Sequence, residues 1–253
     1  LLIRDAGQPG DTRWVDDRED LPRIIRAGRH IARPRRYIRN YAWEVEPEDL
    51  VAQVRVEARA GDGWVKLVGD WIDREVGDLA PCWPVDVLTE AIAAAHEEGA
   101  RVTAHCFEEE SLHDFAEAGT DCIEHATGLT EATIATFAAQ QISIVPTLVN
   151  IDTFPSIAAG AERFPTYAAH MLDLHARRHA TIAAAREAGI PIYVGTDGGG
   201  RIAHGLVVDE MHELLACGFS NAEALDAGSW AARRWLGRPA LEEGADADLL
   251  VLA

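Results

Sequence analysis

Residues 63–71 read GWVKLVGDW, and they place a lysine, Lys66, in the middle of an apolar run. Such a run is typical of a strand that is buried on both faces. A buried ammonium group without a partner is costly, so the lysine must pair with an anion, lose its charge or reach water. The rest of the chain has to decide between these outcomes and to supply the sheet to which this strand belongs.

The order of elements around this strand repeats along the chain. Five times a helical run, a short turn and a β-rich strand follow one another, and four of the helices have a glycine just after their last turn. With two further candidates near the N-terminus, the expected strands are 1–5, 29–38, 64–69, 101–106, 121–126, 142–148 and 191–197. Continuous apolar strands that alternate with helices predict an α/β fold with a parallel sheet.

Seven strands in 253 residues come close to a (β/α)8 TIM-type barrel, which needs eight strands and about 250 residues. We predict such a barrel without its strand 1, because the chain starts with strand-like residues and no initiator Met. An open doubly wound sheet is the alternative, but no GxGxxG motif follows any strand. Residues 6–63 and 149–165 are predicted to be long connections, of the kind that faces the substrate in barrels.

Composition narrows the choice of partners. The net charge is −19, from 23 basic and 42 acidic residues, so neither nucleic acid nor an anionic membrane is an expected partner. No apolar stretch approaches the roughly 18–20 residues that span a bilayer, and no signal peptide is visible. The four scattered cysteines form no CxxC pair and indicate reduced thiols in a cytoplasmic protein. We expect a small-molecule substrate and leave a homo-oligomer open.

Four of the predicted strands carry a reactive polar side chain at or near their ends: Lys66, His105, His125 and Asp197. Taken one at a time, each has an ordinary structural explanation, such as a hydrogen-bonded histidine or a turn aspartate. In a barrel, however, all four project from the C-terminal rim, where barrel enzymes have their active sites. Two imidazoles, a carboxylate and a lysine on one rim predict a divalent metal site. Zinc is the expected ion because it favours nitrogen and carboxylate ligands.

Three segments carry a resemblance to a known family. GWVKLVGD, RVTAHCFEEESLHDFAEAGTDCIEHATGL and YVGTDGGG resemble the metal-dependent amidohydrolase superfamily, nearest to its imidazolonepropionase-like enzymes and its Xaa-Pro and Xaa-Lys/Arg dipeptidases. The resemblance implies hydrolysis of an amide, peptide or cyclic amide C–N bond by a metal-activated water. It implies that Lys66 is carbamylated and bridges two metals. His105 and His125 would bind the second metal, whereas Asp197 would bind the first and act as the general base.

The chain departs from the family pattern in two places. It contains no HxH motif, which supplies the superfamily's first metal site from strand 1. It also carries only GADADLLVLA of the flanking β-sandwich, so we predict a barrel over 1–240 and the start of a β-sandwich segment over 241–253. A chain that represents its protein incompletely accounts for both departures. The alternative is a non-catalytic or inactive barrel that lacks the first metal site.

Other residues have weaker claims to the site. His204 and Arg201, shortly after Asp197, are candidates for substrate binding, Arg201 through a substrate carboxylate. His175 and His179 have the i,i+4 spacing of a helical zinc pair but lack the HExxH glutamate, so a surface or packing role is favoured. No GxSxG motif supports a serine hydrolase. A mononuclear deaminase of the same fold is disfavoured, because the resemblance implies no strand-four lysine in those enzymes.

Overall fold

The strand that carries Lys66 lies in the middle of a parallel sheet. The computed structural model describes residues 1–245 and residue 248. Its main sheet has the order β10-β9-β8-β5-β3-β4, and every neighbouring pair is parallel. The bounds are β3 Ile31–Ala32, β4 Trp43–Glu44, β5 Trp64–Val68, β8 Arg101–Cys106, β9 Cys122–His125 and β10 Ser143–Val145. This arrangement confirms the predicted α/β fold of a TIM-type barrel.

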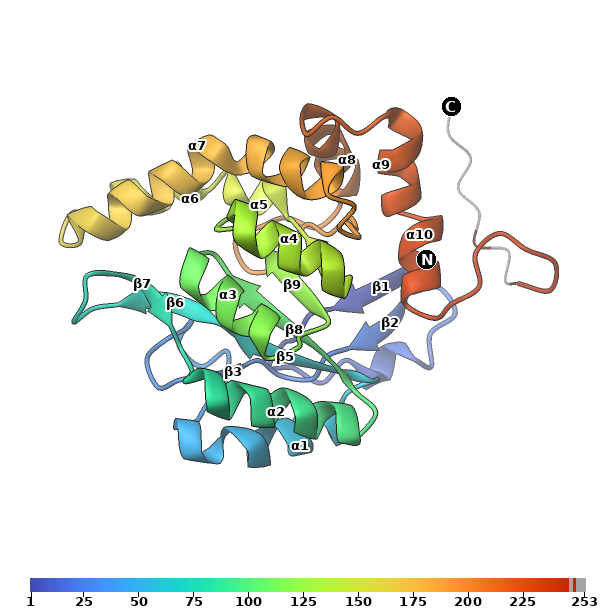
Figure 1. The fold of residues 1–253 in the computed structure, drawn as a ribbon. Coiled ribbons are helices and arrows are strands. Elements are labelled where there is room, and N and C mark those ends of the chain that lie inside the picture. Colours follow the sequence, from blue (N-terminus) through green and yellow to red (C-terminus); the bar gives the residue numbers. More distant parts are fainter. Residues whose placement is uncertain (246–247, 249–253) are drawn as a thin grey trace.

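Two smaller strand pairs accompany the main sheet. The parallel pair β1 (Leu2–Asp5) and β2 (Arg23–Arg26) lies beside it, as Figure 1 shows in blue. The antiparallel hairpin of β6 (Asp70–Asp73) and β7 (Asp78–Pro81) follows β5 directly. Because it follows the carboxyl end of β5, the hairpin projects from the end of the sheet at which the predicted site residues lie.

Helices follow the strands and pack on one another around the sheet (Figure 1). Gly99 and Gly119 have φ angles of 78° and 82° after two of the helices, which confirms their predicted left-handed caps. The helices are α1 Leu50–Ala60, α2 Val85–Glu97, α3 Glu109–Glu117, α4 Glu131–Gln140, α5 Leu148–Ile151, α6 Phe154–Ala159, α7 Pro165–Glu187, α8 Val207–Ala216, α9 Asn221–Ala227 and α10 Trp230–Trp235, with short 3-10 turns at Arg13–Val15 and Pro47–Asp49. No helix in the part of the chain that the structure describes is both long and apolar enough to cross a membrane.

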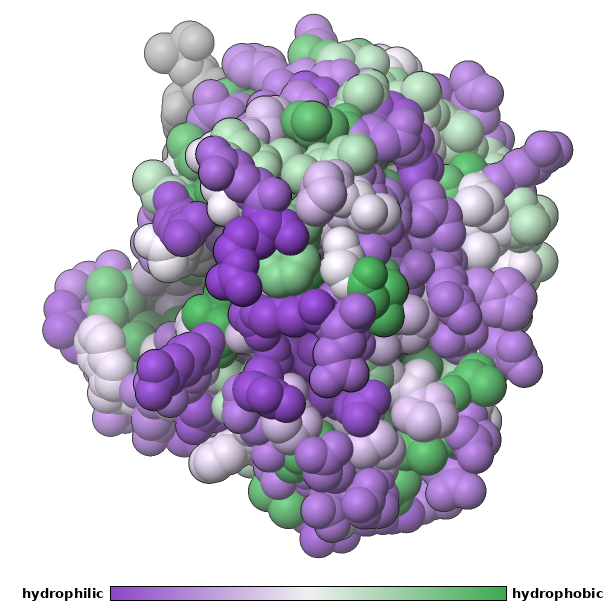
Figure 2. Space-filling model, turned by 90° about the vertical axis from the view of Figure 1, so that its left-hand side faces the viewer, coloured by the Kyte–Doolittle hydropathy of each residue, from purple (hydrophilic) through white to green (hydrophobic). Residues whose placement is uncertain are grey.

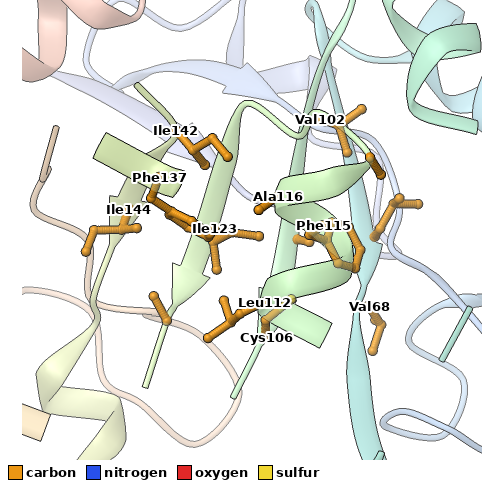
Figure 3. Close-up of a cluster of buried hydrophobic side chains, with 14 of the residues drawn as sticks. Val68, Val102, Cys106, Leu112, Phe115, Ala116, Ile123, Phe137, Ile142 and Ile144 are labelled. Atoms are coloured by element: carbon orange, nitrogen blue, oxygen red, sulfur yellow. The ribbon is translucent and has the colours of Figure 1, made fainter. Parts of the chain in front are cut away.

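Part of the hydrophobic core lies between the sheet and the helices α3 and α4. Figure 3 shows Phe115 and Phe137 reaching from these helices toward Ile123 and Val102 of the sheet. Phe115 is 1 % exposed and Phe137 is fully buried. Burial of each such ring stabilises the fold by about 1.5–3 kcal/mol. The packing of α3 and α4 therefore holds in place the strands that carry the candidate site.

Three predicted strands are shorter than expected, each for a local reason. The strand predicted over 29–38 is only Ile31–Ala32, because Pro34 and the left-handed Arg35 (φ 63°) turn the chain. The strand over 142–148 ends at Val145, since Pro146 has no amide hydrogen for the ladder.

The strand predicted over 191–197 makes only an isolated bridge between Ile192 and Ile144. The amide of Tyr193 donates to the carbonyl of Ile144, and the next bond of this ladder is missing because Pro146 has no amide hydrogen. The amide of Val194, which faces the other edge of the segment, donates to the carbonyl of Ala227 in α9.

The two long connections contain more regular structure than expected. Residues 149–165 hold most of α5 and all of α6, and residues 6–63 hold β2, β3, β4 and α1. The predicted β-sandwich segment over 241–253 falls mostly outside the described residues, so its domain boundary stays a prediction.

Candidate metal centre

Lys66 lies on β5 with its side chain buried; the residue is 3 % exposed. Burial lowers the pKa of its amine, and the nearby carboxylates of Glu124 and Asp197 oppose that shift. No carboxylate within the described ranges forms a hydrogen bond with Lys66, and Asp197 accepts a hydrogen bond from Asn150 instead. The buried amine of Lys66 therefore loses its proton more readily than an exposed lysine does.

The two predicted histidines meet beside this lysine. The Nδ1 atom of His105 on β8 lies 2.9 Å from the Nε2 atom of His125 on β9. Burial is the main reason that the pKa of each imidazole lies well below its usual value, and the positive charge of Lys66 adds to the effect. Both rings are therefore neutral near pH 7, the form in which histidine binds a metal.

The backbone turns His125 toward its partner. His125 follows Glu124 directly, so regular strand alternation would send their side chains to opposite faces. His125 instead has a left-handed φ of 72°, and its ring packs at 4.7 Å from that of His105, centroid to centroid. A non-glycine residue is strained in this conformation, and such strain concentrates at functional sites.

Asp70 anchors the loop after His105, and sequence reasoning missed it. Its Oδ2 atom accepts hydrogen bonds from the amides of Phe107 (2.6 Å) and Glu108 (3.0 Å) and from the hydroxyl of Ser111 (2.7 Å). Its Oδ1 atom lies 3.9 Å from His105 Nε2, and both of these buried atoms have no hydrogen-bond partner. Burial, with the neighbouring Glu108, raises the pKa of Asp70 to about 7. The carboxyl is thus placed to orient the imidazole from behind.

Thr147 and Glu210 support His125 in the same manner. The Oγ1 atom of Thr147 lies 2.6 Å from His125 Nδ1, and Thr147 itself has a left-handed φ of 49°. Glu210 of α8 is fully buried and accepts hydrogen bonds from the amides of Leu148 and Val149, each at 2.9 Å. Burial raises the pKa of Glu210 to about 7. A carboxylate 62 residues away from Leu148 therefore fixes the turn that holds the imidazole.

Glu124 forms a second buried contact near Lys66. It accepts hydrogen bonds from Arg4 of β1 (2.6 Å) and from the hydroxyl of Thr103 on β8 (2.5 Å). The guanidinium of Arg4 in turn stacks over the ring of Trp64 at 4.9 Å. The segment CIEHA contained this glutamate beside the histidine, but nothing in its spacing separated it from an ordinary strand residue.

Asp197, Arg201 and His204 lie at the exposed edge of the site. The Oδ2 atom of Asp197 accepts a hydrogen bond from Asn150 Nδ2 at 3.0 Å, and its backbone is left-handed with φ 51°. Desolvation raises the pKa of Asp197, and Lys66 opposes the shift. His204 packs against Gly198, where a Cβ atom would lie 3.1 Å from His204 Nδ1. Arg201 is exposed and forms no ion pair within the described part of the chain.

His175 and His179 of α7 each contact a carboxylate outside this cluster. His175 contacts Asp152 at 3.3 Å, and His179 contacts Glu213 of α8 at 2.6 Å. Both contacts are part of the packing around α7, as the packing interpretation of this pair predicted.

The donor set fits a metal in part. Within residues 1–245 and 248, no group of three or more His, Cys, Asp or Glu side chains is arranged to hold an ion. The structure brings two neutral imidazole nitrogens together with an amine beside them. Asp197 is hydrogen-bonded to Asn150 and does not join them. A third ligand at this position would have to come from Lys66 after its conversion to an anion. The metal roles of the four residues therefore stay predictions.

Known proteins resemble this chain over its whole length. A Mycobacterium tuberculosis protein described as uncharacterized is 59% identical over 254 residues, which cover 100% of this chain and 69% of that protein. A putative prolidase from Bifidobacterium longum is 25% identical with a TM-score of 0.81, and the match covers 98% of this chain and 65% of the prolidase chain. A Xaa-Pro dipeptidase crystallised with bound methionine is 21% identical with a TM-score of 0.79, and the match covers 97% of this chain and 67% of the dipeptidase chain.

A family assignment follows from the sequence match. The sequence pattern of the Amidohydrolase family matches residues 62–253, a range that includes Lys66, both histidines and Asp197. The match confirms the predicted superfamily and the predicted enzyme class, a hydrolase that acts on carbon–nitrogen bonds. Together with the fold shared with the prolidase-like structures, it shows that this chain belongs to the amidohydrolase family.

Proposed function

We propose that the protein hydrolyses amide or peptide bonds of small substrates at a divalent metal centre, with zinc the expected ion. The observation that carries the proposal is the convergence of His105 Nδ1 and His125 Nε2 at 2.9 Å beside the buried amine of Lys66. Dipeptides are the first substrates to test, because two solved proteins with this fold are named a Xaa-Pro dipeptidase and a putative prolidase.

Lys66 is suited to become the third ligand. Burial lowers the pKa of its amine, and the free amine is the form that adds to carbon dioxide. The ammonium group first loses one proton; the free nitrogen then forms a bond to the carbon of CO₂ and releases a second proton, so a buried cation becomes an anion. The new carboxylate removes the burial penalty of the ammonium group when cations are near.

The other residues have separate tasks in this proposal. A divalent metal, when bound, lowers the pKa of water and polarises the substrate carbonyl. His105 and His125 would hold that ion, while Asp70 and Thr147 keep the two rings oriented. Asp197 would accept a proton and return it to the leaving nitrogen, a role that suits its raised pKa and its exposed position.

The test is a metal and activity assay of the purified protein with zinc and bicarbonate, using a panel of dipeptides and N-acyl amino acids. Lys66→Ala and His125→Ala should lose bound zinc and reduce kcat/KM by about a thousandfold or more. His113→Ala is the matched control, because His113 lies on α3 with a side chain 66% exposed. If Lys66→Ala kept both the zinc and the activity, the proposed centre would be wrong.

A non-catalytic role is the second candidate. The chain contains no HxH motif, and its described residues hold no ready group of three His, Cys, Asp or Glu ligands. A barrel that binds a small molecule without cleaving it would bind substrates in the same assay, take up no zinc and show no turnover.

A further inference from the structure

A pocket of about 470 Å³ reaches the surroundings of His105 through Tyr37, and four of its eight lining residues are arginines. Arg35 and Arg39 come from the loop after β3, and Arg74 comes from the turn between β6 and β7. The first segment follows the carboxyl end of β3, and the second belongs to the hairpin that follows β5, on the side of the molecule that Figure 2 faces. Hydrophilic residues crowd the middle of that face.

The charge of this pocket is opposite to that of the chain. Four arginines line it, the fourth being Arg29, and the only acid among its lining residues is Glu44. The chain as a whole carries a net charge of −19. Within the described residues none of the four guanidinium groups forms an ion pair, whereas arginines elsewhere, such as Arg55 and Arg177, are paired with carboxylates. Uncompensated positive charge is thus concentrated at one concave place.

Two of these arginines are fixed and two are free to bind. Arg29 donates to the carbonyls of Tyr41 (2.8 Å) and Asn40 (2.9 Å) and lies 4.3 Å over the ring of Trp43. Arg74 donates to the carbonyl of Arg35 at 3.3 Å. The side chains of Arg35 and Arg39 form no hydrogen bond to any residue that the structure describes. Their ten N–H donors in all are available to a ligand.

One aromatic side chain joins the pocket to the metal-site residues. Tyr37 lines the pocket, and its ring lies 5.7 Å from that of His105 and 4.9 Å from that of Trp71, centroid to centroid. A substrate with its scissile bond at the histidine pair can therefore place a group of amino-acid size against the arginines. The pocket lies where it can select the residue on one side of that bond.

We propose that this pocket binds the carboxylates of an acidic residue, glutamate or aspartate, on one side of the scissile bond. This inference rests on the proposed function and names its substrate class. Guanidinium groups bind carboxylates through paired, charge-assisted hydrogen bonds. The ten free N–H donors of Arg35 and Arg39 exceed what a single α-carboxylate needs. A lysine or arginine substrate residue at the same place would meet repulsion, so the pocket also excludes cationic substrates.

The first test measures binding and needs neither metal nor turnover. Isothermal titration of the whole protein with N-acetyl-L-glutamate and its isosteric amide N-acetyl-L-glutamine isolates the side-chain carboxylate, because both ligands share the α-carboxylate. We expect glutamate to bind about tenfold or more tightly, and the preference to shrink as ionic strength rises. Equal affinity for the two ligands would show that the pocket does not read the acidic side chain and would overturn the inference.

The second test removes the two free arginines. The double variant Arg35→Gln and Arg39→Gln should bring the two affinities within about twofold, with the melting temperature unchanged. Arg163→Gln is the matched control, since Arg163 is also exposed and forms no ion pair within the described ranges. A preference that survived the double variant would contradict the assignment.

Hydrolysis of dipeptides that end in Glu or Gln then separates the two claims. A tenfold preference for the Glu peptide that disappears in the double variant supports the pocket assignment. An active enzyme with no such preference refutes the pocket and leaves the proposed hydrolase in place. Glutamate-selective binding by a protein that takes up zinc but cleaves nothing refutes the hydrolase and leaves the pocket in place.

Discussion

The two sides of the candidate metal centre are built in different ways. His105 and His125 end neighbouring strands of one sheet, and two buried carboxylates, Asp70 and Glu210, anchor the loops around them. Asp197 lies on a segment that pairs with β10 at one residue only, and it is exposed. In the proposed centre, the histidine side would be preorganised to hold an ion, whereas the aspartate side would be free to exchange partners, as a proton carrier must.

The largest expected effect comes from the exposed side. Asp197→Asn removes a base but leaves both imidazoles in place, so the zinc held by the histidines should remain. We expect kcat to fall by about 10²- to 10⁴-fold. Metal analysis and steady-state kinetics on one preparation check this. His105→Ala is the contrasting variant, which should lose both the zinc and the activity. Loss of all zinc from Asp197→Asn would show that the two sides do not have separate tasks.

The next effect concerns the stability of the anchored side. Glu210 has a pKa raised from its usual 4.5 to about 7, so between these pH values the unfolded chain loses a proton that the folded chain keeps. Folding stability contributed by this group therefore falls as pH rises from about 4.5 to about 7, by about 3 kcal/mol. Urea unfolding of the wild type and Glu210→Gln across this range measures it. The wild type should lose stability relative to the variant, and a constant difference would contradict the assignment.

A smaller effect is expected at Asp70. In Asp70→Asn one oxygen can still accept the amides of Phe107 and Glu108, but an NH₂ group replaces the oxygen that faces His105 Nε2. The exchange turns an acceptor into a donor and favours the wrong imidazole tautomer. Zinc affinity should fall about 10- to 100-fold, as for other residues behind a metal ligand. Chelator competition measures it, with the exposed Asp86→Asn as the control. An unchanged zinc affinity would show that Asp70 only anchors the loop and does not orient His105.

The smallest effect lies outside the site. His170 of α7 contacts Asp78 of β7 at 3.0 Å and Glu109 of α3 at 3.2 Å, and these carboxylates raise its pKa to about 9. The stabilisation is fully present below pH 6.5 and is lost as pH rises through about 9. His170→Gln should therefore destabilise the fold by about 1 kcal/mol at pH 6, because the partly exposed contact is screened by solvent. Denaturation of both proteins at pH 6 and pH 10 checks this. An equal loss of stability at the two pH values would show that the charge of His170 does not contribute.

Much of the histidine side was predictable from sequence, because it depends on local patterns. Apolar runs between glycine-capped helices indicated β5, β8 and β9, and the strand ends indicated Lys66 and the two histidines. The strand predicted over 191–197 shortens to a single bridge, because Pro146 next to it cannot donate the following hydrogen bond. The register that sets Pro146 beside this segment comes from the fold and leaves no trace in local periodicity.

The supporting residues could not be found in this way. Asp70, Thr147 and Glu210 act through contacts with residues 22 to 62 positions away. Although Asp70 ends the GWVKLVGD segment, nothing in the spacing of these three residues marks a role, and acids and threonines are common on protein surfaces. Their buried environment, which only the fold supplies, is what distinguishes them. The arginine pocket is similar, since its members are drawn from two separate loops.

The proposed function depends on the conversion of Lys66 to a metal-binding carbamate beside the two histidines. Carbon-13 NMR of the zinc-loaded protein in ¹³C-bicarbonate detects such a group. We predict one protein-bound carbamate resonance that is absent from Lys66→Ala and disappears when zinc is removed. A protein that binds zinc and cleaves its substrate without that resonance would contradict the account.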